Sequence, residues 1–434
     1  MLLAVVLLYR VTGLPSWNSV YAEDRGIFLV QALNHPWDLI VPYNGYLQLL
    51  PRMLAQAVSL LPLTWAAALF AWAGALIAAG CALFVYHASS GYIRSRALRA
   101  VLALCLVLLP IAPLELADNG VNTPWYLMVA LFWAVLWRPE SRSGKLASAA
   151  VAFGTVASSP LAAIFAPLLA VRVLVLRPFR WPGSLRDHWV TAGWLLGWPL
   201  QLYAMALAPP GQRASAPTTI VAAAGYWTQT VVLRAFGWHL SWDLVRATGT
   251  VGATLLCGTL LLGLLALAWL PGGRQARVLI PLAVVMGFVY TVGSAYITGY
   301  VVRQAPYEHP VSFEAASRYS ALPLILIYAS LIAGADALAR REGGIRRALS
   351  GLAGRPGPRA AATATALAVL AAVLVPAWVT DYSYQTQRTS GGAWKPIATR
   401  DLRHCDRHPS IVLPEWTGRH GLYRITVPCS RLVR

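Results

Sequence analysis

Charged side chains are scarce in this sequence, making up only 12% of its 434 residues. A typical soluble domain carries about 25%. Hydrophobic residues make up 58% of the chain, so a fold of this composition could not cover a water-facing surface with polar groups. The shortage of charge excludes an ordinary soluble protein and indicates that lipid is the main solvent.

Lysine is almost absent too, because Lys145 and Lys395 are the only lysines among 35 basic residues. In a soluble protein the net charge of +19 would indicate a nucleic-acid partner. Here the arginines fall in short clusters between apolar segments, which is the positive-inside pattern of a membrane protein. We therefore expect membrane lipids around the chain and no nucleic acid.

Metal-binding and redox motifs are missing as well. The five cysteines form no CxxC pair and no Cys/His ligand spacing, so the sequence predicts neither a zinc site nor a redox motif. Cys81, Cys105 and Cys257 lie inside apolar runs, whereas Cys405 and Cys429 lie in a polar C-terminal tail.

Long apolar stretches, in contrast, are abundant. A spanning helix needs about 20 mainly apolar residues, and the candidates lie near 1–16, 64–86, 98–116, 124–137, 146–158, 160–176, 189–208, 248–270, 278–300, 319–338 and 360–380. The sequence thus predicts an all-α polytopic membrane protein with about 11 transmembrane helices, and a transmembrane domain over 1–380. No basic segment precedes the first span to anchor it, which is the pattern expected if the start of the sequence is truncated.

The distribution of arginine predicts the orientation. If the N-terminus is cytoplasmic, the inner loops carry more than twice as many basic residues as the outer loops. An odd number of spans then places the small segment 381–434 outside, where disulfides persist. We expect a Cys405–Cys429 disulfide to stabilise this segment, which has little core of its own. Two unrelated free thiols are the alternative.

The first outer loop, 17–63, contains the adjacent acids Glu23 and Asp24. Repulsion between neighbouring carboxylates can create a proton acceptor that works near neutral pH as a general base. The alternative is an acidic N-cap for the following helix, with Glu23 solvated. An amphipathic stretch from Tyr46 to Val58 follows, and we expect it to rest in the plane of the membrane interface.

The other outer loops supply polar and aromatic candidates. The candidate substrate-binding residues are Asp118, Asn119, Asn122, Tyr226, Trp227, His239 and Tyr319. Aromatic rings beside polar groups suit stacking on sugars, although the interfacial aromatic belt explains many of them equally well. Arg318, with Arg303, could bind a lipid phosphate, and the alternative is a salt bridge to Glu308 or Glu314. Glu115, just inside a span end, is either functional or snorkels to the interface.

These residues carry a family resemblance. The segments AEDRGIFLVQALN and PYNGYLQLLPR, the polar turn before Trp125-Tyr126, Arg318-Tyr319 and the late Pro428-Cys429 resemble a largely uncharacterised bacterial multi-pass family. The acidic first loop, the amphipathic helix and the span count resemble the GT-C superfamily of membrane glycosyltransferases, which use polyprenyl-phosphate sugar donors. This resemblance implies a catalytic base at Asp24 or Glu23, with Asp24 preferred, and a donor phosphate held by Arg318 and Arg303.

The resemblance also implies a setting, a bacterial inner (cell) membrane with a cell-envelope glycan or lipid as acceptor. The sequence departs from the family pattern because its two acids are adjacent rather than spaced as DxD. This difference leaves dependence on a divalent cation open. The leading hypothesis is an inverting glycosyl transfer on the extracytoplasmic face. A lipid or glycan transporter or flippase, and a non-catalytic membrane scaffold, are the alternatives.

Overall fold

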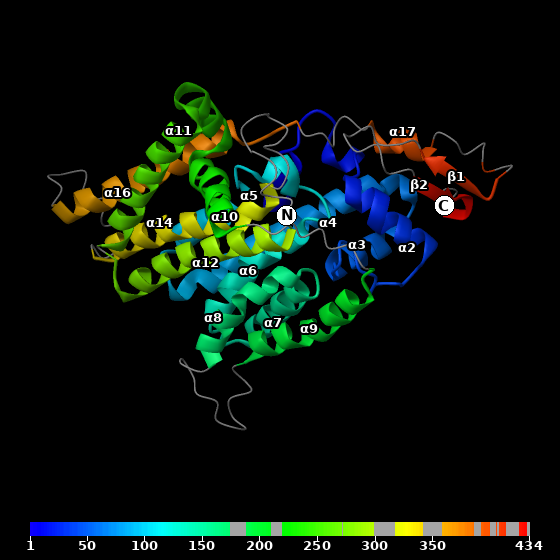
Figure 1. Cartoon of the computed structure of the whole chain (residues 1–434), viewed down its shortest axis with the longest axis horizontal. Coiled ribbons are helices and arrows are strands. Elements are labelled where there is room, and N and C mark those ends of the chain that lie inside the picture. The colour runs from blue at the N-terminus through cyan, green and yellow to red at the C-terminus, as the bar shows by residue number, and fades with distance from the viewer. Residues whose placement is uncertain are drawn as a thin grey trace.

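The computed structural model describes residues 1–173, 188–209, 219–270, 272–298, 317–341, 358–385, 392–399, 405, 408–413 and 425–431. Helices dominate these residues (Figure 1). They are α1 Leu2–Leu8, α2 Val30–Asn34, α3 Leu49–Ser59, α4 Ala66–Ala88, α5 Arg96–Val107, α6 Thr123–Leu136, α7 Arg142–Val156, α8 Ala166–Val171, α9 Trp189–Leu207, α10 Ile220–Trp227, α11 Trp238–Trp269, α12 Arg274–Thr298, α14 Ala321–Arg341, α16 Pro358–Thr380 and α17 Trp394–Thr399.

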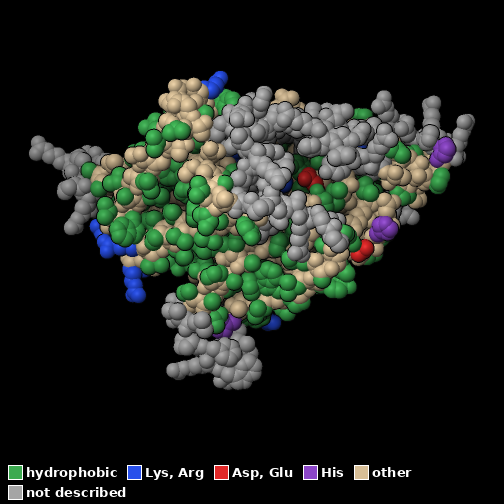
Figure 2. All heavy atoms as spheres, in the orientation of Figure 1, with side chains coloured by type: hydrophobic (Ala, Val, Ile, Leu, Met, Phe, Trp, Pro, Cys, Tyr) green, Lys and Arg blue, Asp and Glu red, His purple; other side chains and the backbone are tan. Residues whose placement is uncertain are grey.

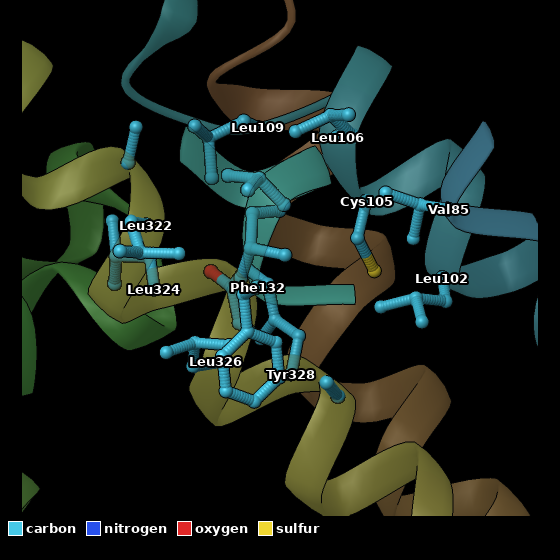
Figure 3. Packing of buried hydrophobic residues seen from close by; sticks show 14 of the residues in the cluster. Val85, Leu102, Cys105, Leu106, Leu109, Phe132, Leu322, Leu324, Leu326 and Tyr328 are labelled. Carbon is cyan, nitrogen blue, oxygen red and sulfur yellow. The ribbon is translucent and has the colours of Figure 1, made fainter. Parts of the chain in front are cut away.

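Helix α14 forms the centre of the molecule. Its most apolar window is 94% buried, and it packs against α5, α6, α11, α12 and α16. Figure 3 shows Leu324, Leu326 and Tyr328 of this helix packed beside Phe132 of α6. A helix that is apolar all round and covered on every side is the expected core of a large helical bundle.

The peripheral helices, in contrast, expose apolar surface. The most apolar windows of α11 and α16 are only 22% buried, and Leu255 and Leu262 of α11 are 65% and 70% exposed. Hydrophobic side chains cover much of the face shown in Figure 2. Water would not tolerate so large an apolar surface, so the chain is a helical membrane protein.

Five described helices are long and apolar enough to cross a membrane: Leu63–Gly91, Trp238–Trp269, Arg274–Tyr296, Ser317–Arg341 and Ala361–Thr380. Most other predicted spans coincide with shorter helices. The predicted span 98–116 is broken, because α5 ends at Val107 and Pro110 cannot donate a helical hydrogen bond. Twelve residues of helix extend only about 18 Å, so the predicted count of 11 spans stays a prediction.

Three of the five predicted inner loops are joined by hydrogen bonds near the end of α14. The Asp336 carboxylate near the end of α14 accepts hydrogen bonds from the backbone N–H groups of Arg94 and Ser95. From the next turn of the same helix, Arg340 donates to Gln275 at the start of α12. Three loops that the arginine pattern places on one side are therefore joined.

The first outer loop and the C-terminal tail lie together at another end, at the right of Figure 1. Trp394 of α17 is buried and donates its indole N–H to the Leu63 carbonyl at 2.8 Å. It belongs to one hydrophobic cluster with Phe28 and Leu29 of the first loop and Val427 of the tail. The tail therefore shares its core with loop 17–63.

The tail departs from the all-helical expectation. Strands β1 (Ser410–Leu413) and β2 (Ile425–Pro428) pair antiparallel, with Ile411 opposite Val427. Both segments are rich in β-branched residues, which favour strands. The predicted disulfide is confirmed: Cys405 and Cys429 are bonded, with Cα atoms 5.5 Å apart.

Candidate functional site

Asp24 lies at the start of a short π-helix, η2 (Asp24–Leu29), and is fully buried. Its two carboxylate oxygens accept hydrogen bonds from the backbone N–H groups of Gly120 and Val121, at 2.7 and 2.8 Å. A Cβ at position 120 would lie 3.0 Å from the Asp24 Oδ1, which explains the glycine. The predicted cap for the helix that follows is not formed; Asp24 instead joins the first loop to the 118–122 turn.

The turn at 118–122 is closed by its own side chains. Asn119 donates to the carbonyls of Glu115 and Ala117, and its Oδ1 accepts the Asn122 N–H at 2.9 Å. Asn122 also donates to the Glu115 carbonyl at 2.8 Å, and Asp118 is buried at a positive φ of 58°. The polar residues expected to bind substrate are thus largely engaged in holding the turn.

Glu115 pairs with Arg318. It lies in a second π-helix, η5 (Ala112–Leu116), which packs against the 3₁₀ turn η11 (Ser317–Ser320) at the start of α14. The Arg318 Nη1 donates to Glu115 Oε1 at 2.6 Å, and the Arg318 backbone N–H donates to Oε2 at 3.2 Å. The alternative of a salt bridge to Glu308 or Glu314, and the predicted role of Arg303, lie outside the described residues.

Several tyrosines interact electrostatically with one or both members of this ion pair. Tyr21 interacts electrostatically with Glu23, Glu115 and Arg318 and hydrogen-bonds Asn122. Tyr46 interacts with Tyr319, Arg318 and Glu23, Tyr226 with Tyr319 and Glu115, and Tyr290 with Tyr319, Tyr46, Tyr226 and Arg318. We call this group the Arg318 cluster; its members are Tyr21, Glu23, Tyr46, Glu115, Tyr226, Tyr290, Arg318 and Tyr319.

The phenols of the cluster are hydrogen-bond donors. Burial raises the pKa of Tyr21, Tyr46 and Tyr226 above the ordinary phenol value, and neighbouring acids raise the pKa of all three further. These side chains therefore stay neutral at physiological pH and offer an O–H to an anionic ligand. Tyr319 also packs edge-to-face on Trp125, with ring centroids 4.9 Å apart, which fixes one wall of the cluster.

The two adjacent acids face different neighbours. Asp24 is bound to the backbone of the 118–122 turn, whereas Glu23 is only partly buried and interacts with Tyr21, Tyr46 and Arg318. Successive side chains of a helix point about 100° apart, so the side chains of Glu23 and Asp24 point in different directions. Asp24 therefore joins two loops, whereas Glu23 interacts electrostatically with Arg318.

His239 and Trp227 have other described neighbours. The His239 Nδ1 lies 2.5 Å from the Asp381 Oδ1, and its ring lies 3.6 Å from that of Trp238. Trp227 packs edge-to-face on Phe288. Their described contacts do not include the Arg318 cluster, whereas those of Tyr226 and Tyr319 do.

Several residues of the site were missed by sequence reasoning. Tyr21, Tyr46 and Tyr290 carry no motif, and only the fold brings them to Arg318. Arg10 could have been noticed as a charge within an apolar run: it is fully buried and donates to the Val107, Asp381 and Tyr382 carbonyls. Among the described residues, no group of three or more His, Cys, Asp or Glu side chains could hold a metal ion.

No family model, curated protein or solved structure matches the chain. Its function has to be inferred from its own residues.

Proposed function

We propose that the chain is a membrane glycosyltransferase that moves a sugar from a polyprenyl-phosphate donor to an acceptor hydroxyl on the extracytoplasmic face of a bacterial cell membrane. The proposal includes 11 spans and a cytoplasmic N-terminus, so that the first loop, the Arg318 turn and the tail face outward. The GT-C resemblance supports it from the sequence.

One structural observation carries the proposal. The carboxylate of Glu23 in the first loop interacts electrostatically with Arg318 and with the neutral phenol of Tyr46, although nearly 300 residues separate Glu23 from Arg318 in the sequence. Glycosyl transfer from a lipid phosphate needs a proton acceptor for the attacking hydroxyl and a cationic site for the leaving phosphate. The Arg318 cluster supplies both.

The chemistry then assigns a role to each group. Arg318 binds the donor phosphate, with the phenols of the cluster as further hydrogen-bond donors. The acceptor oxygen attacks the anomeric carbon from the opposite face, its proton passes to the Glu23 carboxylate, and the bond from the anomeric carbon to the phosphate oxygen breaks. Polyprenyl phosphate leaves with the bonding electron pair. Asp24 holds η2 against the 118–122 turn and so positions Glu23.

The purified protein, incubated with a panel of labelled polyprenyl-phosphate sugars and cell-envelope acceptors, tests this function. We expect formation of glycosylated acceptor and free polyprenyl phosphate, and a loss of about 100-fold in rate for Arg318→Gln, as for removal of one transition-state donor. Arg246→Gln is the matched control, because Arg246 pairs with Asp243 on an exposed helix face.

Equal turnover by the wild type and the folded Arg318→Gln variant would contradict the proposal. A lipid flippase, the second class of function, would move the donor across the bilayer and leave its sugar attached. Lipid translocation without release of polyprenyl phosphate would therefore favour the flippase.

A further inference from the structure

The Glu115 carboxylate occupies a set of donors that suits an anion. Its Oε1 accepts the Arg318 Nη1 at 2.6 Å, and its Oε2 accepts the Arg318 backbone N–H at 3.2 Å and the Ser317 hydroxyl at 3.4 Å. A guanidinium, a backbone N–H at the start of a helix and a hydroxyl are the groups with which proteins commonly bind phosphate.

Further buried donors lie on η11 or interact with Arg318. Within the described part of the chain, the hydroxyls of Tyr290 and Ser320 and the Nε of Arg318 are buried and lack a hydrogen-bond partner. Tyr290 and Ser320 are fully buried, and Tyr290 interacts electrostatically with Arg318. Buried donors without partners are costly. The polyprenyl monophosphate that leaves after transfer has three terminal oxygens to accept their hydrogen bonds, whereas a carboxylate has two.

Glu115 also differs from the acids that join distant segments through backbone N–H groups. Asp24 and Asp381 are fully buried, and each accepts backbone N–H groups of a distant segment. The side chains of Glu115 and Arg318 remain 10% and 22% exposed. The pair lies between a π-helix and a 3₁₀ turn, and π-helical segments occur frequently at functional sites.

We propose that Glu115 is an internal anion that holds Arg318 until the phosphate of a polyprenyl lipid takes its place. This inference rests on the proposed function and adds to it a competition between the Glu115 carboxylate and the lipid phosphate for Arg318. The phosphate and the carboxylate do not both remain on Arg318, because two anions held by one guanidinium repel each other strongly in a partly desolvated site. Tyr21 and Tyr226 both interact electrostatically with Glu115, and we propose that these neutral phenols receive the displaced carboxylate.

Equilibrium binding of a polyprenyl monophosphate to the full-length protein in nanodiscs tests the competition. Glu115→Gln should bind the lipid phosphate about tenfold more tightly than the wild type, because the competing charge is gone. Glu115→Asp, whose side chain is one methylene shorter, should fall between the two. Asp243→Asn is the control, since it removes the same charge and breaks an exposed carboxylate–arginine pair.

Two further ligands identify what is recognised. Inorganic phosphate reports the anion alone and should show the same order of affinities with weaker binding, whereas uncharged polyprenol should not distinguish the variants. Arg318→Gln should lose phosphate-dependent binding. If Arg318→Gln loses binding but Glu115→Gln binds no more tightly than the wild type, Glu115 merely positions Arg318 and the competition is wrong. If the wild type does not prefer polyprenyl phosphate to polyprenol, the proposed function itself fails.

Discussion

At the scale of single residues, three buried aspartates join distant parts of the chain in the same way. Each accepts hydrogen bonds from two consecutive backbone N–H groups: Asp24 from residues 120 and 121, Asp336 from 94 and 95, and Asp381 from 238 and 239. Buried N–H groups need an acceptor, so these carboxylates replace backbone pairing where two loops meet.

Replacement of Asp24 by alanine should therefore destabilise the fold. Both N–H groups would lose their acceptor, at about 1–3 kcal/mol each, and thermal or denaturant unfolding in detergent measures the loss. Asp38→Ala, an exposed acid of the same loop, should change stability by less than about 0.5 kcal/mol. Unfolding of Asp24→Ala at the same midpoint as Asp38→Ala would refute the structural role.

The buried carboxyl group of Asp381 should make the stability of the fold depend on pH. Burial raises its pKa above the ordinary 3.8, although hydrogen bonds from the His239 ring and the Trp238 N–H partly offset this. The Asp381 carboxyl group thus binds its proton more tightly in the folded chain than in the unfolded chain. The resulting stabilisation is fully present below about pH 4 and is lost as the pH rises through the raised pKa.

The free energy of unfolding measured from pH 4 to 8 tests this dependence. The stability of the wild type relative to Asp381→Asn should fall as the pH rises, because the variant cannot titrate. Asp243→Asn, on an exposed face of α11, should follow the wild type at every pH. A pH-independent difference between the wild type and Asp381→Asn would contradict the assigned shift.

At the scale of elements, the site is built from irregular helices. Glu23 immediately precedes the π-helix η2, and Glu115 lies within the π-helix η5. A third π-helix, η9 (Thr228–Val232), packs against η11, which contains Arg318. Apolar periodicity could not predict them, because it detects long regular helices. It did locate the helices around α14, whose apolar runs leave little choice of structure.

Close packing of α4 on the 118–122 turn gives a prediction for this element. A Cβ at Gly74 would lie 2.6 Å from the Asn119 carbonyl oxygen and 2.7 Å from its nitrogen. Gly74→Ala should therefore displace the turn and cost about 1–3 kcal/mol. Gly80→Ala, on the same helix, meets nothing within 4 Å and should be neutral or slightly stabilising through helix propensity.

The comparison of Gly74→Ala with Gly80→Ala also reports on the site. Because the turn holds Asp24 and the backbone of Glu115, only Gly74→Ala should weaken binding of polyprenyl phosphate. If both variants unfold at the same temperature and bind the lipid equally, then α4 does not support the Arg318 cluster through this contact.

At the scale of the whole molecule, three predicted inner loops are joined to one another, and the first outer loop is joined to the tail. Hydrogen bonds join residues 94–95, 275 and 336–340 in one group, and loop 17–63 shares a hydrophobic core with the tail in the other. The arginine pattern places the three joined loops on one side of the membrane, and cysteine placement predicted the Cys405–Cys429 disulfide. The side of the membrane that each group faces stays a prediction.

The composition of the site was harder to predict than the fold. Glu115 and Arg318 are 203 residues apart, and neither belongs to a motif that names its partner. The sequence favoured Asp24 as the base, whereas we propose Glu23, because the Asp24 carboxylate is bound to a remote backbone that no local pattern reveals. Such assignments depend on tertiary contacts.

The most direct measurement is the rate of sugar transfer by the folded Glu23→Gln variant under saturating donor. With Glu23 as the general base, kcat should fall by a factor of about 10²–10⁴, while binding of polyprenyl phosphate at Arg318 is retained. Asp38→Asn, in the same loop, should transfer at the wild-type rate. Transfer by folded Glu23→Gln at the wild-type rate would contradict the account.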